Sequence, residues 1–107
     1  MNFMQGTLDV LILRALADRP LHGYDVVAWI RDATGAVLEI EEGALYTALH
    51  RMEARGWLAS RWATSPKGRR AKYYRLTAEG RQQLRLGERE WLRFSGAVTS
   101  VFRGGEA

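Results

Sequence analysis

The basic residues of this chain concentrate in one window, where they could bind a polyanion. Between Ala54 and Ala78 there is no acidic residue, whereas seven of the 16 lysines and arginines fall there. They are Arg55, Arg61, Lys67, Arg69, Arg70, Lys72 and Arg75. All 12 carboxylates lie outside this window, although the net charge of the whole chain is only +4. A block of one sign inside a mixed chain is typical of nucleic-acid-binding surfaces; the alternative is a solvated hairpin that lacks acids by chance.

The same window is predicted to fold as a β-hairpin. Residues 57–64 and 71–76 have the composition of strands, and Pro66 and Gly68 between them favour a turn. We expect Lys67, Arg69 and Arg70 at the tip of the hairpin, and Lys72 just beyond it, to contact phosphates or the minor groove of a duplex. Three aromatic residues interleave with these cations, and we expect them to pack within the hairpin rather than to stack on bases. They are Trp62, Tyr73 and Tyr74.

A helix predicted at about residues 42–55 offers a second contact surface. Its apolar residues Leu45, Leu49 and Met52 must face the core. The opposite face then carries Ala44, Tyr46, Thr47, His50 and Arg51. Hydroxyl, imidazole and guanidinium groups can contact phosphates and base edges, and a threonine methyl can contact a thymine methyl. An ordinary solvated helix face is the alternative, but such a face would carry more glutamate and lysine.

Residues that could support catalysis or hold a cofactor are scarce. The chain has no cysteine and two histidines, which excludes thiol catalysis, disulfides and thiolate zinc sites. It has no glycine-rich phosphate loop, His-Glu metal pair or nucleophile elbow. We therefore expect no enzyme activity and no cofactor. Since signal-peptide and transmembrane patterns are also missing, we expect a cytoplasmic protein without membrane contact.

Three helices are predicted to precede the hairpin and one to follow it. The first begins at a capping Thr7, and the second runs from about His22 to a stop at Gly35. A minor strand is predicted at residues 37–40. The last helix begins after a capping Thr77 and runs to about residue 102. This order predicts a mainly α chain with a small β-hairpin: a winged helix-turn-helix domain at residues 1–76 and a C-terminal helix at residues 77–107.

The last predicted helix carries an apolar seam with heptad spacing. One set seven residues apart is Leu84, Trp91 and Val98, and the other is Gly87, Phe94 and Val101. We expect this seam to join two copies of the chain, with packing back onto the first three helices as the alternative. Trp91 could also stack on a planar ligand between the subunits, although a tryptophan in a seam usually supplies only buried area.

Five sequence motifs resemble the PadR family of bacterial transcriptional regulators. They are GTL at 6–8, LHGY at 21–24, EGALY at 42–46, LHRMEARGW at 49–57 and RRAKYYRLT at 69–77, the last followed by Gly80. The resemblance implies a winged-helix repressor that dimerises through its last helix and binds a palindromic operator. It also implies that a small aromatic effector could release the DNA. Thr47 stands where the family commonly has proline, so contacts at that point are expected to differ.

Two interpretations from other classes stay open at this stage. A winged-helix domain can also serve as a protein–protein interaction module, but such a surface would not be expected to carry seven cations without an acid. A small enzyme is the third possibility, and the missing site chemistry argues against it.

Overall fold

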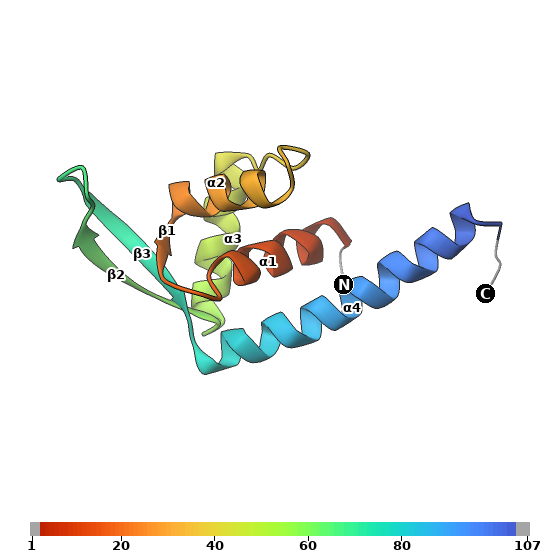
Figure 1. Cartoon of the computed structure of the whole chain (residues 1–107). Coiled ribbons are helices and arrows are strands. Elements are labelled where there is room, and N and C mark those ends of the chain that lie inside the picture. Colours follow the sequence, from red (N-terminus) through yellow and green to blue (C-terminus); the bar gives the residue numbers. More distant parts are fainter. Residues whose placement is uncertain (1–2, 105–107) are drawn as a thin grey trace.

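The computed structural model describes residues 3–104, with side chains from residue 6 onward, and this part contains four helices and three short strands (Figure 1). In chain order these are α1 (Phe3–Ala15), β1 (Leu21–His22), α2 (Gly23–Ala33), α3 (Glu42–Ala54), β2 (Leu58–Thr64), β3 (Arg70–Leu76) and α4 (Ala78–Phe102). The predicted mainly α, winged helix-turn-helix arrangement is confirmed. The predicted domain bounds at residues 1 and 107 lie outside the described residues.

The three strands form one antiparallel sheet in the order β1-β3-β2. β2 and β3 make the predicted hairpin, in register from Leu58 opposite Leu76 to Thr64 opposite Arg70. The two-residue β1 pairs with the other edge of β3. The hairpin is thereby anchored at its base and extends away from the helices at its tip, as a wing (Figure 1).

The core lies between the first three helices and the base of the sheet. Each helix contributes apolar residues at intervals of three and four, as expected for one buried face. The largest buried side chains are Ile12, Leu13 and Leu16 of α1, Val26 and Ile30 of α2, Leu45, Leu49 and Met52 of α3, and Tyr74 of β3. Because the buried face of α3 packs against α1, α2 and β2, its orientation relative to these elements is fixed.

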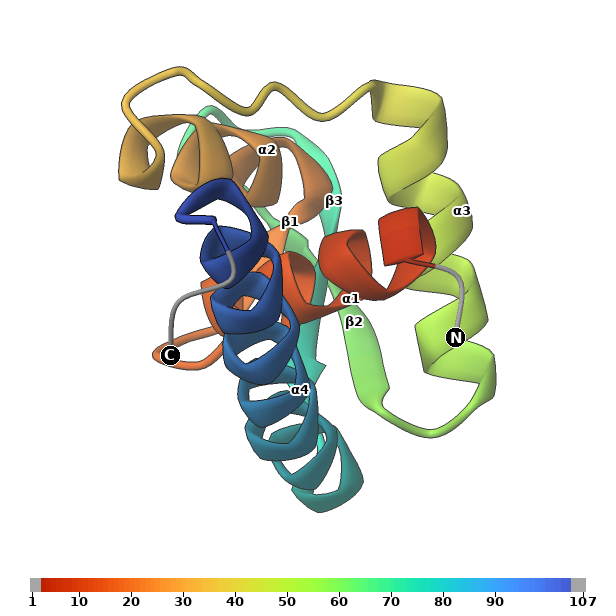
Figure 2. The ribbon, with the colours of Figure 1, turned by 90° about the vertical axis from the view of Figure 1, so that its right-hand side faces the viewer.

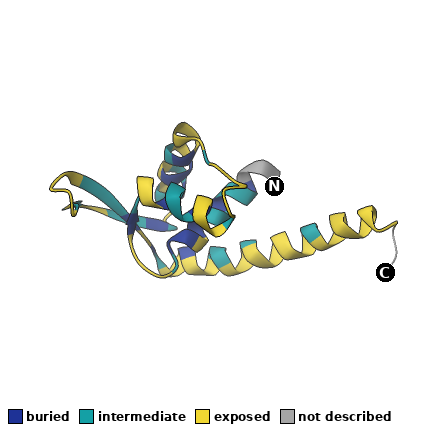
Figure 3. Ribbon diagram, turned by 45° about the horizontal axis from the view of Figure 1, so that its top comes forward, coloured by how far each residue is buried: buried dark blue, intermediate teal, exposed yellow. Residues whose placement is uncertain are grey.

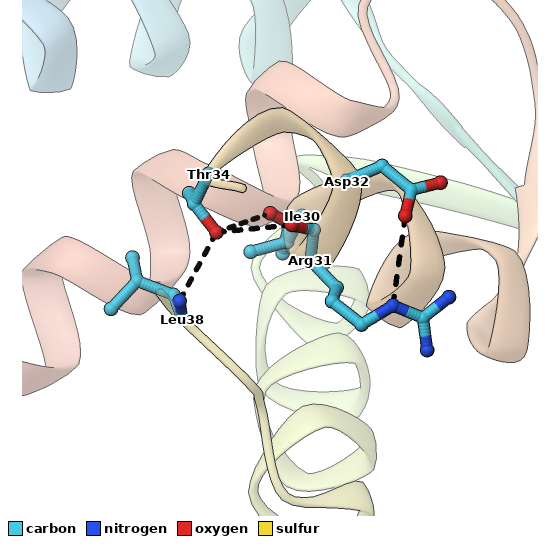
Figure 4. A network of polar contacts seen from close by, with 5 residues as sticks. All are labelled: Ile30, Arg31, Asp32, Thr34 and Leu38. Carbon is cyan, nitrogen blue, oxygen red and sulfur yellow. Dashed lines mark hydrogen bonds and ion pairs between the residues drawn. The ribbon is translucent and has the colours of Figure 1, made fainter. Parts of the chain in front are cut away.

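A threonine organises the connection between α2 and α3. The Thr34 hydroxyl donates to the Ile30 carbonyl at 2.9 Å and accepts a hydrogen bond from the Leu38 amide at 3.1 Å (Figure 4). Gly35 and Ala36 then take positive φ values of 59° and 65°, which ends the helix and turns the chain. The predicted stop at Gly35 is confirmed, and the turn determines where α3 begins.

The start of α4 is joined to the turn that ends α3. Thr77 caps α4 by accepting a hydrogen bond from the Gly80 amide at 3.0 Å, and its hydroxyl donates to the Gly56 carbonyl at 2.6 Å. A Cβ at Gly80 would overlap the Trp57 carbonyl oxygen, so only glycine permits this approach. The predicted Thr77 cap is confirmed, and one end of α4 is rigidly attached to the winged-helix part of the molecule.

Two local predictions are wrong. Thr7 lies inside α1 rather than capping it, because helix-favouring Met4 and Gln5 extend the helix to Phe3. Residues 37–40 form a loop rather than a strand. The strand that pairs with the second edge of β3 is instead Leu21–His22, directly before the helix predicted to begin at about His22.

α4 extends well beyond the compact part of the molecule. Its first half lies along α1, and its second half projects past it (Figures 1 and 2). Twenty-five residues of helix span about 37 Å, which explains why the molecule measures 55 × 28 × 23 Å. No helix among residues 3–104 has the length and apolar character to cross a membrane.

Candidate nucleic-acid interface

The outermost ridge of α3 is small and uncharged. Leu45, Leu49 and Met52 are buried, and successive residues are about 100° apart around a helix axis. The positions farthest from the core are therefore Gly43, Thr47, His50 and Ala54, all exposed. A Cβ at Gly43 would meet only Glu41 Oε1, at 3.8 Å. Such a ridge can approach a duplex closely, with one hydroxyl and one imidazole available for hydrogen bonds.

Two of the five residues predicted on this face lie on the outer ridge, and the others lie on its flanks. Thr47 and His50 are on the ridge. Ala44 is exposed on the flank that faces α1. Tyr46 is half-buried on the opposite flank, where a Cβ at Gly23 would lie 2.8 Å from its Cε1 and Oη atoms. Gly23 thus permits the Tyr46 ring to lie against the first turn of α2.

Arg51 does not project from the helix as a solvated cation. Its Nη1 and Nη2 donate to the two carboxylate oxygens of Asp9 on α1, at 2.8 and 2.7 Å. The side chains are only 23% and 12% exposed, and the hydrogen bond to Asp9 raises the pKa of Arg51 above its usual value. The predicted contact of Arg51 with a phosphate or a base edge stays a prediction, and in this structure the guanidinium is paired with the Asp9 carboxylate.

The base of the wing is linked to α3 through Glu53. Its carboxylate accepts a hydrogen bond from the Ser60 hydroxyl of β2 and pairs with Lys72 Nζ of β3 at 3.3 Å. The Ser60 hydrogen bond, followed by Lys72, lowers the pKa of Glu53. Part of the Lys72 charge is thus compensated inside the protein, so this predicted contact residue also has a structural partner.

The cations at the wing tip project from an ordered turn. The Ser65 amide donates to the Arg69 carbonyl at 2.7 Å, and the Gly68 amide donates to the Ser65 carbonyl at 2.9 Å. Gly68 takes a φ of 79°, which glycine adopts without strain. Lys67, Arg69 and Arg70 are all exposed. The three predicted tip residues therefore lie close together, with Lys67 and Arg69 in the turn and Arg70 at the start of β3.

The last helix divides into a packed half and an exposed half. Leu84 is half-buried against the core of its own chain, and a Cβ at Gly87 would lie 2.5 Å from Val10 Cγ2 of α1. Beyond this contact the helix surface is largely exposed (Figure 3). Four predicted seam residues are in that exposed half, namely Trp91, Phe94, Val98 and Val101, with exposed fractions of 38%, 45%, 38% and 72%.

An apolar groove lies on the surface where α1, the α2–α3 loop, α3 and the middle of α4 meet. It has a volume of about 1050 Å³. Its walls include Leu8 and Leu11 of α1, Leu38 and Ile40 of the α2–α3 loop, Ala44, Thr47 and Arg51 of α3, and Trp91 of α4. The Trp91 ring stacks on Phe94, with centroids 6.2 Å apart. The groove thus brings α3 and the predicted ligand-stacking residue to one surface.

Several residues of this candidate interface were not predicted. Gly43 and Ala54 lie on the outer ridge, and a helical wheel drawn through the buried leucines would have placed them there. Tyr24, which is 72% exposed in the first turn of α2, lines a shallow pocket together with Glu42 and Tyr46 of α3. The partner of Arg51 could not be found by spacing, because Asp9 precedes it by 42 residues.

Within residues 3–104, no three histidine, cysteine or acidic side chains gather as a metal site would require. The chemistry that the described surface offers is hydrogen bonding and positive charge, which suits binding rather than bond making.

Comparison with known proteins places the chain among regulators of transcription. The sequence profile of the transcriptional regulator PadR-like family matches residues 12–86. A transcriptional regulator of Mycobacterium tuberculosis is 34% identical over 84 residues, covering 78% of this chain and 74% of its own length. A PadR family transcription regulator from Clostridium difficile has 34% identity and a TM-score of 0.73, with 89% and 96% of the two chains covered. A transcriptional regulator from Clostridium thermocellum has 29% identity and a TM-score of 0.82, with 94% and 97% covered.

Proposed function

Because this chain belongs to the PadR-like family of transcriptional regulators, whose members bind DNA and are not enzymes, we propose that it is a repressor that binds a palindromic operator as a homodimer. The observation that carries the proposal is the pairing of two surfaces joined by Glu53. One is the small, uncharged ridge of α3, and the other is the cationic tip of the wing. The first suits a groove and the second suits phosphates.

We assign sequence reading to α3. Thr47 and His50 on the ridge contact base edges, with Ala44 and Tyr46 at the two margins of the contact. Arg51 supports the helix from behind, through Asp9. In this assignment the hydroxyl of Thr47 and the imidazole of His50 carry most of the discrimination between sequences, because hydrogen bonds to base edges specify whereas phosphate contacts position.

We assign most of the affinity to the wing. Lys67, Arg69 and Arg70 contact phosphates or the minor groove, and Lys72 adds a smaller part because it also pairs with Glu53. Each phosphate neutralised releases counterions, so affinity falls steeply as salt rises. A regulator of this kind acts on chromosomal DNA, so we also propose a cytoplasmic location.

The exposed half of α4 is proposed as the dimer interface. The face that packs on α1 at Gly87 continues along the helix through Trp91, Phe94 and Val98, whose side chains are 38%, 45% and 38% exposed. A second copy of the same stripe would cover it with a two-fold axis. Residues 1–76 then bind DNA and residues 77–107 join the copies, which puts two α3 helices on half-sites one turn, about 34 Å, apart.

The groove beside Trp91 is proposed to take a small aromatic effector. Its lining is mostly apolar, and a planar molecule stacked on Trp91 would lie near Ala44 and Thr47 of the recognition helix. Binding there would bias the position of α3 relative to α4. The site touches both α3, which we propose reads the DNA, and Trp91 of the proposed dimer interface. An effector bound there could therefore favour a conformation that releases DNA.

The test combines operator selection with a salt series. Duplexes selected from a random pool with the full-length protein are compared with a scrambled duplex by fluorescence anisotropy. We expect tight, salt-dependent binding to the selected sequence. A variant with Lys67, Arg69 and Arg70 changed to alanine should bind both duplexes more weakly. Its salt slope should be smaller by about 0.9 for each phosphate that the wing no longer neutralises.

Ridge variants should behave differently from wing variants. Thr47→Ala and His50→Ala should lose affinity for the selected duplex, by roughly 1–3 kcal/mol if each reads a base, and keep affinity for the scrambled one. Arg89→Ala removes a cation from the polar side of α4; it is the control for charge loss in the wing variant and should change affinity for neither duplex. Binding that does not respond to salt, or ridge variants that lose both duplexes equally, would contradict the proposal.

A further inference from the structure

One large aromatic side chain of the wing is exposed. Trp62 of β2 is 57% exposed, although tryptophan normally contributes to packing. It stands opposite Lys72 in the register of the hairpin, and Arg70 is the diagonal neighbour on the same face. The Arg70 guanidinium carbon lies over the indole, 5.3 Å from the ring centroid. The ring therefore has a specific neighbour, and that neighbour is one of the three tip cations.

The two cations on this face are held in different ways. Lys72 lies 5.4 Å from the centroid of the Tyr74 ring and also pairs with the Glu53 carboxylate. For Arg70, no carboxylate of residues 6–104 comes within ion-pair distance, and the indole is its partner. A carboxylate orients a cation but neutralises it, and it must be released when a phosphate arrives. An aromatic ring orients the cation and leaves the positive charge in place.

Stacking also suits the shape of the guanidinium group. When its flat face lies on a ring, the N–H donors at its edge still point outward and can form two parallel hydrogen bonds with one phosphate. Arginine side chains lose much rotamer freedom when they bind, and a side chain that is already oriented loses less. An exposed indole 5.3 Å from the Arg70 guanidinium carbon thus favours a charged donor that is already oriented in the unbound protein.

We propose that Trp62 is a positioning residue that holds Arg70 in the orientation in which it contacts the DNA backbone. The orientation of Arg70 rests on the Trp62–Arg70 geometry. Its effect on DNA binding rests on the proposed function. It assigns Trp62 an indirect role: the indole acts through Arg70 rather than by stacking on a base. The two parts can be tested separately.

The first test needs no DNA. In the unbound full-length protein, the Arg70 Nε–Hε signal in a ¹⁵N correlation spectrum, assigned with Arg70→Lys, should be shifted upfield by the ring current. The shift should disappear in Trp62→Leu and persist in Trp62→Phe. Thermal unfolding of each variant shows that the fold is intact. An unshifted signal in the wild type would overturn the proposed orientation, whatever the protein binds.

The second test is a double-mutant cycle on duplex binding. Trp62→Leu should weaken binding by about two- to fivefold, the range expected for one exposed cation–π contact, and Trp62→Phe should restore most of it. Arg70→Ala should weaken binding more and lower the salt slope by about 0.9 per subunit. In the Arg70→Ala background, Trp62→Leu should then have no further effect.

The outcomes separate the two hypotheses. An equal loss from Trp62→Leu with and without Arg70 would show that the indole contacts DNA itself, and would overturn the positioning role. A shifted Nε–Hε signal in a protein that shows no salt-dependent duplex binding would leave the geometry standing and contradict the proposed function instead.

Discussion

The guanidinium of Arg51 and the carboxylate of Asp9 form a two-bonded ion pair that joins α3 to α1, with donor–acceptor distances of 2.8 and 2.7 Å. Both side chains are largely shielded from water. α1 also packs on α4 at Gly87, so this pair links α3, the proposed recognition helix, through α1 to the helix that carries the proposed dimer interface. Arg51 is therefore part of the support of α3.

We predict that breaking this pair destabilises the fold. Arg51→Ala leaves the Asp9 carboxylate shielded and without its partner, and it should lower the free energy of unfolding by about 3 kcal/mol. The double variant Asp9→Leu/Arg51→Met should recover most of that loss, because apolar residues of similar volume can replace a shielded pair. Urea unfolding measures both. A loss of DNA affinity in Arg51→Ala with unchanged stability would instead restore Arg51 as a direct contact.

A methyl group at Gly80 should separate α4 from the turn that ends α3. Its Cβ would overlap the Trp57 carbonyl oxygen, so Gly80→Ala should cost about 1–3 kcal/mol of stability as the helix shifts. Gly96→Ala is the matched control in the same helix, because no atom lies within 4 Å of the Cβ it would add. The control should stabilise the protein by about 0.5–1 kcal/mol through helix propensity. Equal effects of the two substitutions in thermal unfolding would contradict the close approach.

The link between α3 and the wing should depend on pH through Glu53. Its pKa is lowered in the folded protein, first by the Ser60 hydrogen bond. A lowered pKa means that the stabilisation is fully present above the ordinary glutamate value of 4.5 and is lost as the pH falls through the folded-state pKa. The stability difference between wild type and Glu53→Gln should therefore be constant near neutral pH and shrink in acid.

Urea unfolding of both proteins at a series of pH values checks this. Ser60→Ala serves as the control, because it removes the leading cause of the shift and should reduce the acid-dependent part of the difference. A difference between wild type and Glu53→Gln that does not change between neutral pH and strongly acidic pH would refute the role of the ionised carboxylate.

A charge placed in the exposed stripe of α4 should separate the proposed dimer. Val98→Asp puts a carboxylate where the second copy would bury it, and should weaken dimerisation by at least about 3 kcal/mol. Ser100→Asp adds the same charge on the opposite side of the helix, where it stays in water. In sedimentation velocity the control should remain at twice the chain mass while Val98→Asp sediments as a monomer. Two dimers would place the interface elsewhere, and a monomeric control would contradict a dimer joined only along this stripe.

The fold was largely predictable because local signals and tertiary packing agree. Thr77 caps α4 and Gly35 ends α2, as their residue types indicated. The wing turn forms around Gly68, as predicted. The resemblance to the PadR family, drawn from five motifs, is confirmed by the profile match over residues 12–86. β1 was not predicted because a strand of two residues is too short to show an alternation of apolar and polar residues. It forms only by pairing with Tyr73 and Tyr74, which lie far along the chain.

The interface was predictable in its chemistry and less so in its detail. An acid-free run of cations indicated the wing, because charge needs no partner to be recognised in a sequence. The partner of each cation depends on contacts that sequence spacing does not reveal. Arg51 pairs with Asp9, Lys72 pairs with Glu53, and Arg70 lies over Trp62. The DNA contacts, the effector site and the dimer remain predictions, since each involves a second molecule.

The continuity of α4 relates the length of one helix to the spacing of a DNA site. One end is attached at Gly80 to the winged-helix part, which we propose binds DNA, and the other carries the proposed contact with the second copy. Each residue in between adds about 1.5 Å and turns the stripe by about 100°. Insertion of one residue after Gly87 would thus rotate the two proposed DNA-binding parts relative to each other. Insertion of seven would nearly preserve the contact face of α4 and would move these two parts apart by about two helical turns. We accordingly expect that related regulators with differently spaced half-sites differ in the length of this helix by about seven residues or a multiple of seven.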